Sequence, residues 1–223
     1  MRRARHFWGD ENVNNSPLWD GERPASHPEN AASDILLQIR SCRICTGLPL
    51  GPKPLLQMDP EARILIAGQA PGRKTHEKGI PFDDASGNRL RSWMGVDRAT
   101  FYDPRKVAIL PMGFCFPGTG SGGDLPPRAQ CAAQWRGAVL DQLRNIELTL
   151  VIGRYALAWH LPDALAKHGG RLTPLVQNWR EHWPMALPLP HPSPRNNRWL
   201  AKNQWFEEDV LPRLQARVAG LIL

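Results

Sequence analysis

The chain has 223 residues, which is enough for one α/β domain with a sizeable buried core. No apolar run reaches the roughly 18 residues that a membrane span needs, and no charged-then-apolar leader begins the chain. We therefore expect a cytoplasmic protein with no membrane partner. Lys and Arg total 28 against 21 for Asp and Glu, a net charge of +7. This excess favours a phosphate-bearing partner, because guanidinium groups match phosphate oxygens, but it also fits an ordinary solvated surface.

The first part of the chain has no hydrophobic period and many polar residues. We expect residues 1–32 to form a flexible arm. Residues 33–223 are expected to form a single domain, which would begin with a short helix over 34–40. Ser33 stands where a helix cap is common.

Apolar runs then alternate with helical patterns. The runs predict strands at 63–67, 106–110, 148–152 and 185–190. The helical patterns lie at 87–94, about 127–143, 156–160 and 197 to about 218. Four apolar strands separated by helices predict an α/β fold with three αβα layers around a central four-stranded parallel sheet.

Two loops that end predicted strands carry most of the chemical interest. Gly68-Gln69-Ala70-Pro71-Gly72 follows the first strand, and His191-Pro192-Ser193-Pro194 follows the last. Such loops can face each other at the carboxyl edge of a parallel sheet, where open α/β folds bind ligands. The first loop offers backbone N–H groups and close approach, and the second offers a histidine beside a hydroxyl. We expect a pocket for a flat, polar, eventually anionic group.

The four cysteines form two pairs, Cys42 with Cys45 and Cys115 with Cys131. The first is a C-x2-C pair, and fifteen residues rich in Gly and Pro separate the other two. Four thiolates spaced in this way hold either zinc or an iron–sulfur cluster, and spacing alone does not separate the two. Ordinary buried thiols are the alternative, whereas disulfides are disfavoured in a cytosolic chain.

Together these motifs resemble the uracil-DNA glycosylase superfamily, specifically its iron–sulfur branches, families four and five. The loop 68–72 looks like the first motif of that superfamily, and 191–194 is similar to the second. Residues 79–87 resemble the segment that carries the base-stacking aromatic ring. The cysteine pattern resembles the ligand set of a structural [4Fe–4S] cluster, with zinc as the lesser alternative. The resemblance covers about residues 33–215 and implies a monomer that hydrolyses the N-glycosidic bond of a deaminated base in DNA, uracil first.

This hydrolysis leaves positive charge on the sugar and negative charge on the departing base, so it needs donors at the base and a carboxylate or water at the sugar. The base must also leave the duplex and enter a pocket. The resemblance implies that Phe82 stacks on the base and that His191 donates to its oxygen. Asp84 is expected to orient water or stabilise the sugar charge, with Asp83 as substitute. Alternatively, one of these aspartates caps the helix that opens near Gly87.

The resemblance implies further contacts and shows three departures. The remaining substrate-binding candidates are Gly68, Gln69, Ala70, Gly72, Met112 and Ser193, and the DNA-binding candidates are Lys74, Arg195, Asn196 and Asn197. Ala70 replaces the aspartate of the best-known branch, and Pro111 stands where the iron–sulfur branches carry a base-reading asparagine. Gly72 leaves open the place of a ring that excludes thymine. These changes fit a wider range of deaminated bases, or a catalytically weak or inactive protein that binds damaged or single-stranded DNA.

Overall fold

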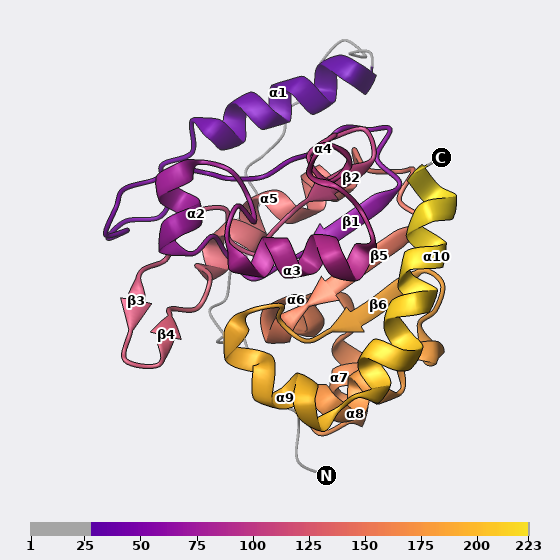
Figure 1. Ribbon diagram of the computed structural model, residues 1–223. Helices are drawn as coiled ribbons and strands as arrows, with labels where there is room; N and C mark the ends of the chain where they lie inside the picture. The colour runs from indigo at the N-terminus through magenta and orange to yellow at the C-terminus, as the bar shows by residue number, and fades with distance from the viewer. Residues whose placement is uncertain (1–27, 223) are drawn as a thin grey trace.

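Four parallel strands form the central sheet of the computed structural model, which describes residues 28–222 (Figure 1). The strands are β1 (Ile64–Ala67), β2 (Val107–Ile109), β5 (Leu148–Ile152) and β6 (Ala186–Leu189), in the order β2-β1-β5-β6. The four predicted strands are confirmed, with ends that shift by at most one residue. Most of the expected arm, residues 1–27, lies outside the described residues.

Each strand contributes to two cores, because alternate residues of a strand point to opposite faces of a sheet. On β1, Ile64 and Ile66 pack on one face, whereas Leu65 and Ala67 pack on the other. The first face is covered by α3 (Ala85–Met94) and α10 (Leu211–Ile222). The second is covered by α1 (Pro28–Arg40), α5 (Ala129–Leu140) and α6 (Gly153–His160). This arrangement confirms the predicted three αβα layers (Figure 1).

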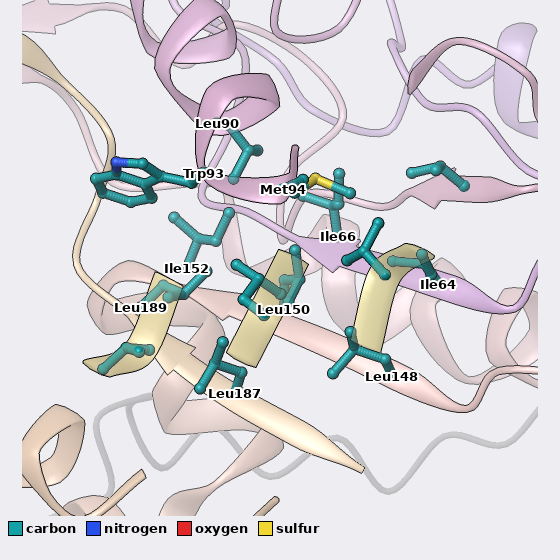
Figure 2. Packing of buried hydrophobic residues seen from close by; sticks show 14 of the residues in the cluster. Ile64, Ile66, Leu90, Trp93, Met94, Leu148, Leu150, Ile152, Leu187 and Leu189 are labelled. Carbon is teal, nitrogen blue, oxygen red and sulfur yellow. The ribbon is translucent and has the colours of Figure 1, made fainter. Parts of the chain in front are cut away.

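The core on the α3 face is apolar and buried (Figure 2). Three strands supply Ile64, Ile66, Leu148, Leu150, Ile152, Leu187 and Leu189, and α3 supplies Leu90, Trp93 and Met94. This continuous apolar layer fixes the height of α3 above the sheet, and therefore the place of the residues that open α3.

The order of the strands determines where a ligand can bind. The chain leads from the central strand β1 to β2 on one side and then crosses to β5 on the other. The carboxyl ends of β1 and β5 therefore form a topological switch point, the usual binding place in open α/β sheets. At the far edge, β6 contains Pro188, which a strand tolerates where one side lacks a partner.

Several predicted helices have other limits. The first helix begins at Pro28, so residues 28–32 are not part of an arm and Ser33 lies inside the helix instead of capping it. The predicted last helix is split into α9 (Asn197–Lys202), a π-helical turn (Phe206–Val210) and α10. The break follows Asn203, whose side chain donates to the Trp199 carbonyl at 2.7 Å and so competes with the helix pattern.

Other elements lie where the sequence predicted no helix or strand. They include the helices α2 (Arg73–Lys78), α4 (Arg98–Phe101), α7 (Pro162–Lys167) and α8 (Leu172–Gln177), and a hairpin of β3 (Thr119–Gly120) and β4 (Gly123–Asp124). The α2 sequence has no apolar residue, yet the helix buries Thr75 and His76. None of the helices within residues 28–222 is long and apolar enough to cross a bilayer.

Candidate functional site

A cleft of about 720 Å³ opens at the carboxyl edge of the sheet. Its lining includes the loop 68–72 after β1, the segment before α3 that contains Phe82, and the loop 191–196 after β6. The two loops that end predicted strands therefore lie in one cleft, together with the candidate stacking ring. Gly153, which follows β5 with a φ of 78°, also approaches it, because a Cβ added there would lie 3.9 Å from His191 Cδ2.

The loop after β1 presents backbone to the cleft. A Cβ added to Gly68 would lie 3.3 Å from Cζ of Phe82, so the aromatic ring rests directly against this loop. The loop is held from below, where the N–H groups of Met112 and Gly113 donate to the Gly68 and Gln69 carbonyls at 2.9 and 3.0 Å. The absence of a side chain at Gly68 therefore allows the close approach of the Phe82 ring to this loop.

Phe82 has an unusual backbone, with a φ of 55°. A Cβ at Gly87 would lie 1.6 Å from the Phe82 carbonyl oxygen, so this conformation depends on glycine at position 87. Arg91 also donates to that oxygen at 3.4 Å, and Phe101 packs edge-on against the ring with centroids 6.4 Å apart. A non-glycine residue held at positive φ is often part of a functional site, because the surrounding structure must maintain it.

Asp84 caps a helix and also lines the cleft. It is the N-cap of α3, and its Oδ1 accepts a hydrogen bond from the Gly87 N–H at 2.9 Å. It also lines the cleft, and its charge acts to raise the pKa of His191. Capping occupies one carboxylate oxygen and fixes the side chain, so the second oxygen is held in a defined place.

Asp83 does not line the cleft. Its carboxylate forms ion pairs with Arg98 at 2.6 Å and with Lys78 at 3.3 Å, and the hydrogen bond from Arg98 lowers the pKa of Asp83. The structure therefore does not place Asp83 for the substitute role that the sequence suggested.

His191 is half-buried in the loop after β6, and its tautomer follows from its neighbours. The Ser193 N–H donates to Nδ1 at 3.2 Å, so the neutral ring carries its proton on Nε2. Burial lowers the pKa of His191, against the opposing effects of the Asp84 and Asp124 charges. The ring is therefore a neutral N–H donor at neutral pH, which is the form suited to an oxygen that gains negative charge.

Arg89 of α3 was not predicted from the sequence, but it fixes the loop after β6. Its guanidinium donates to the carbonyls of Pro192 at 3.4 Å and Ser193 at 3.1 Å, and to Oδ1 of Asn197 at 2.7 Å. Asn197 is thus occupied as an internal partner and does not line the cleft. Arg89 positions the histidine loop against the helix that Asp84 caps.

The structure corrects the expectation for Met112. Its side chain is 1% exposed and packs with Ala67 and Ala132 in the core beneath the sheet, so it does not line the cleft. Pro111 lines the cleft instead, because successive residues of this extended segment point in opposite directions. Among the remaining candidates, the cleft lining includes Gln69, Ala70, Gly72, Lys74, Ser193, Arg195 and Asn196.

A family model described as the uracil DNA glycosylase superfamily matches residues 56–215. The chain belongs to this superfamily. The match spans both cleft loops, the Phe82 segment and the last two cysteines. Membership of the uracil DNA glycosylase superfamily indicates, in general terms, a DNA glycosylase that hydrolyses N-glycosyl bonds.

One wall of the cleft in this superfamily member comes from the unpredicted β3–β4 hairpin. Asp124 at its end lines the cleft, and its Oδ2 lies 3.1 Å from the place that a Cβ on Gly72 would occupy. Arg195, expected to contact DNA, donates from Nη1 to the Gly122 carbonyl at 3.2 Å and so ties the hairpin to the histidine loop. The glycine-rich stretch 118–123 was the available signal for this turn.

The four cysteines line a second, much smaller cavity of about 20 Å³. They are free thiols from three separate segments, and Cys42 and Cys131 accept N–H···S hydrogen bonds from Trp135 at 3.4 Å and from Phe114 at 3.3 Å. Burial, helped by the other cysteines, raises the pKa of the Cys131 thiol to about 12. Across residues 28–222, no group of three or more His, Cys, Asp or Glu side chains is arranged to hold a metal ion.

Proposed function

We propose that the protein is a DNA glycosylase that hydrolyses the N-glycosidic bond of a flipped, deaminated base in DNA repair, with uracil as the first candidate. One observation carries this proposal. The ring of Phe82 and the Nε2–H of neutral His191 lie in one cleft at the switch point of the sheet. A flat base that has left the helix needs such a surface on which to stack and such a donor at its oxygen.

The proposed reaction breaks the C1′–N bond, and the bonding electron pair leaves with the base. The Nε2–H of His191 stabilises the oxygen on which that negative charge accumulates. Asp84, fixed by its capping bond to Gly87, orients a water molecule whose oxygen bonds to C1′ and whose proton passes to a carboxylate. The negative charge of the Asp84 carboxylate also stabilises the positive charge that develops on the sugar.

We further propose that the cleft receives the base from a strand held along its mouth. Lys74 and Arg195 are the basic side chains that we assign to phosphate contact, together with the amide of Asn196. The Asn196 amide also donates to the His191 carbonyl at 2.7 Å, so DNA contact and the position of the histidine are coupled.

Cys42, Cys45, Cys115 and Cys131 are the residues that we propose hold a [4Fe–4S] cluster, with zinc as the lesser alternative. The chemistry of the donor set supports this proposal, because four free thiols line one cavity and two of them accept N–H···S hydrogen bonds, as cluster thiolates do. When bound, such a centre would cross-link three distant segments of the chain and so serve structure. Purification without oxygen separates the two alternatives, because an iron–sulfur protein is brown and a zinc protein is colourless.

The second candidate function is a catalytically weak or inactive member that binds damaged or single-stranded DNA. Ala70 and Pro111 favour it, since both line the cleft without a polar side-chain group where related enzymes carry one. The cytoplasmic location and the monomeric state remain predictions in either case.

The experiment that tests the proposal is an oligonucleotide panel, single-stranded and duplex, that carries uracil, hypoxanthine, xanthine or ordinary bases. Abasic product is detected by alkali cleavage. We expect product from at least one deaminated base, and a fall of about a hundredfold or more in Asp84→Asn, which keeps the helix cap but removes the charge. Absence of product from every substrate with metal-loaded protein would overturn hydrolysis and favour the binding-only function.

A further inference from the structure

The β3–β4 hairpin forms a wall of the cleft that is fixed at both ends. At its base, the Leu125 N–H donates to the Gly118 carbonyl at 2.8 Å. At its tip, the Gly122 carbonyl accepts the bond from Arg195. These contacts hold the last residue of the hairpin, Asp124, beside the loop that follows β1.

Asp124 is oriented within this wall. The Thr119 hydroxyl, across the hairpin, donates to Oδ1 at 3.4 Å, which directs Oδ2 toward Gly72. The Gly72 position is where a side chain would have filled the cleft, and here a carboxylate oxygen approaches it instead. Asp124 is exposed, so its carboxylate is accessible to a ligand.

The two carboxylates of the cleft lining stand in different places. Asp84 lies at the start of α3 with one oxygen bonded to Gly87, whereas Asp124 lies on the side of the loop after β1. Pro111 also lines the cleft and offers no side-chain hydrogen-bonding group. Asp124 is therefore a charged acceptor available in the same lining as Phe82 for the edge of a stacked base.

We propose that Asp124 reads the flipped base by accepting a hydrogen bond from the ring N–H that deamination creates. Uracil carries N3–H where cytosine has a bare, lone-pair-bearing N3, and hypoxanthine carries N1–H where adenine has a bare N1. A carboxylate accepts from the first of each pair and repels the lone pair of the second. One acceptor thus distinguishes uracil from cytosine and hypoxanthine from adenine without the asparagine that position 111 lacks. This inference rests on the proposed function, since it names how the same cleft selects its base.

The test uses a ligand pair that differs in this N–H. In 1-methyluracil the methyl group takes the place of the sugar, and 1,3-dimethyluracil also lacks the N3–H. Dissociation constants are measured by ligand-observed NMR for the metal-loaded protein and its variants. We expect the wild type to bind 1-methyluracil at least about tenfold more tightly than 1,3-dimethyluracil, because the second compound leaves a carboxylate without its partner.

The variants assign this preference to one side chain. Asp124→Ala should remove it, and Asp124→Asn should keep part of it, because an amide oxygen still accepts. Asp34→Ala, which removes an exposed carboxylate from α1 outside the cleft lining, should keep it in full. Equal melting temperatures of the variants would show that they fold alike.

An unchanged ratio in Asp124→Ala would overturn the inference, as would a wild type that binds neither compound. The abasic-product assay reports separately on hydrolysis. Selective binding without product would overturn the proposed enzyme but not the reading of the base. Abasic product together with an unchanged ratio of the two dissociation constants in Asp124→Ala would overturn the reading of the base by Asp124 but not the proposed enzyme.

Discussion

The cysteine cavity and the cleft are built from one stretch of chain but have opposite character. Pro111 and the hairpin residues Gly122 and Asp124 line the cleft, whereas the two ends of the following segment, 113–115 and 128–131, contribute to the cysteine cavity. The cavity is about 20 Å³, whereas the cleft is about 720 Å³ and open to charged side chains. A space of the first size can join segments of chain but cannot admit a base. The single segment 111–131 therefore contributes both to a small structural cavity and to the cleft proposed for catalysis.

A buried arginine holds the segment 110–111, which leads into both regions. Arg136 is 1% exposed and donates to the carbonyls of Leu110 at 3.2 Å and Pro111 at 3.3 Å. Its other terminal nitrogen contacts the ring of His160. Burial lowers the pKa of Arg136 to about 10 and that of His160 to about 3, with Arg136 adding to the effect on His160.

The largest expected effect comes from breaking the cysteine cavity. Cys131→Ser should abolish bound metal and lower the free energy of unfolding by several kcal/mol, because metal binding at structural sites contributes directly to folding. Metal analysis and urea denaturation measure the two effects. A variant as stable as the wild type, with no metal in either, would show that these are ordinary buried thiols.

Two helical glycines sharpen the comparison on the cleft side. Gly87→Ala should cost about 3 kcal/mol or more and disturb the base site, because the new Cβ would collide with the Phe82 carbonyl. Gly137→Ala in α5 is the matched control, since nothing lies within 4 Å of its added Cβ. It should stabilise the protein by about 0.5–1 kcal/mol. Chemical denaturation of both variants checks this, and equal effects would contradict the close approach at Gly87.

The free energy of unfolding should depend on pH through His160, which contacts Arg136. Folded His160 has a pKa of about 3, whereas the unfolded side chain titrates near 6.5. Below about pH 6.5 the unfolded state therefore binds a proton that the folded state does not, and stability falls. Between pH 7 and pH 5 this amounts to about 2 kcal/mol for His160. In His160→Gln the loss of unfolding free energy between pH 7 and pH 5 should be smaller by that amount, as measured by urea denaturation at several pH values. An unchanged loss would contradict a neutral His160 ring in the folded protein.

The smallest effect concerns the mouth of the cleft. Arg195→Ala should weaken binding to a single-stranded oligonucleotide by about 1 kcal/mol or less. It should also reduce the slope of log K against log salt concentration by about 1. Arg144→Ala is the control, because that residue lies in the turn before β5, outside the cleft lining. Fluorescence anisotropy at several salt concentrations makes the measurement. Equal slopes for both variants would remove Arg195 from the DNA surface.

The sequence predicted the sheet because buried parallel strands are apolar without interruption, as in Ile64–Ala67. It also predicted that the loops after β1 and β6 would meet, since their strands are parallel. It could not place the hairpin, because the approach of Asp124 to Gly72 is a tertiary contact of a short, polar turn. Met112 was misplaced because the direction of a side chain in an extended segment depends on a register that spacing does not give.

In the proposed mechanism a base stacks on Phe82 while its oxygen accepts a hydrogen bond from His191. The single-turnover rate of uracil release from a single-stranded oligonucleotide tests this most directly. His191→Ala should slow release by about a hundredfold to a thousandfold, the usual effect of removing one donor from a developing oxyanion. Binding of the intact oligonucleotide should change little. Equal release rates for the wild type and His191→Ala would contradict the account.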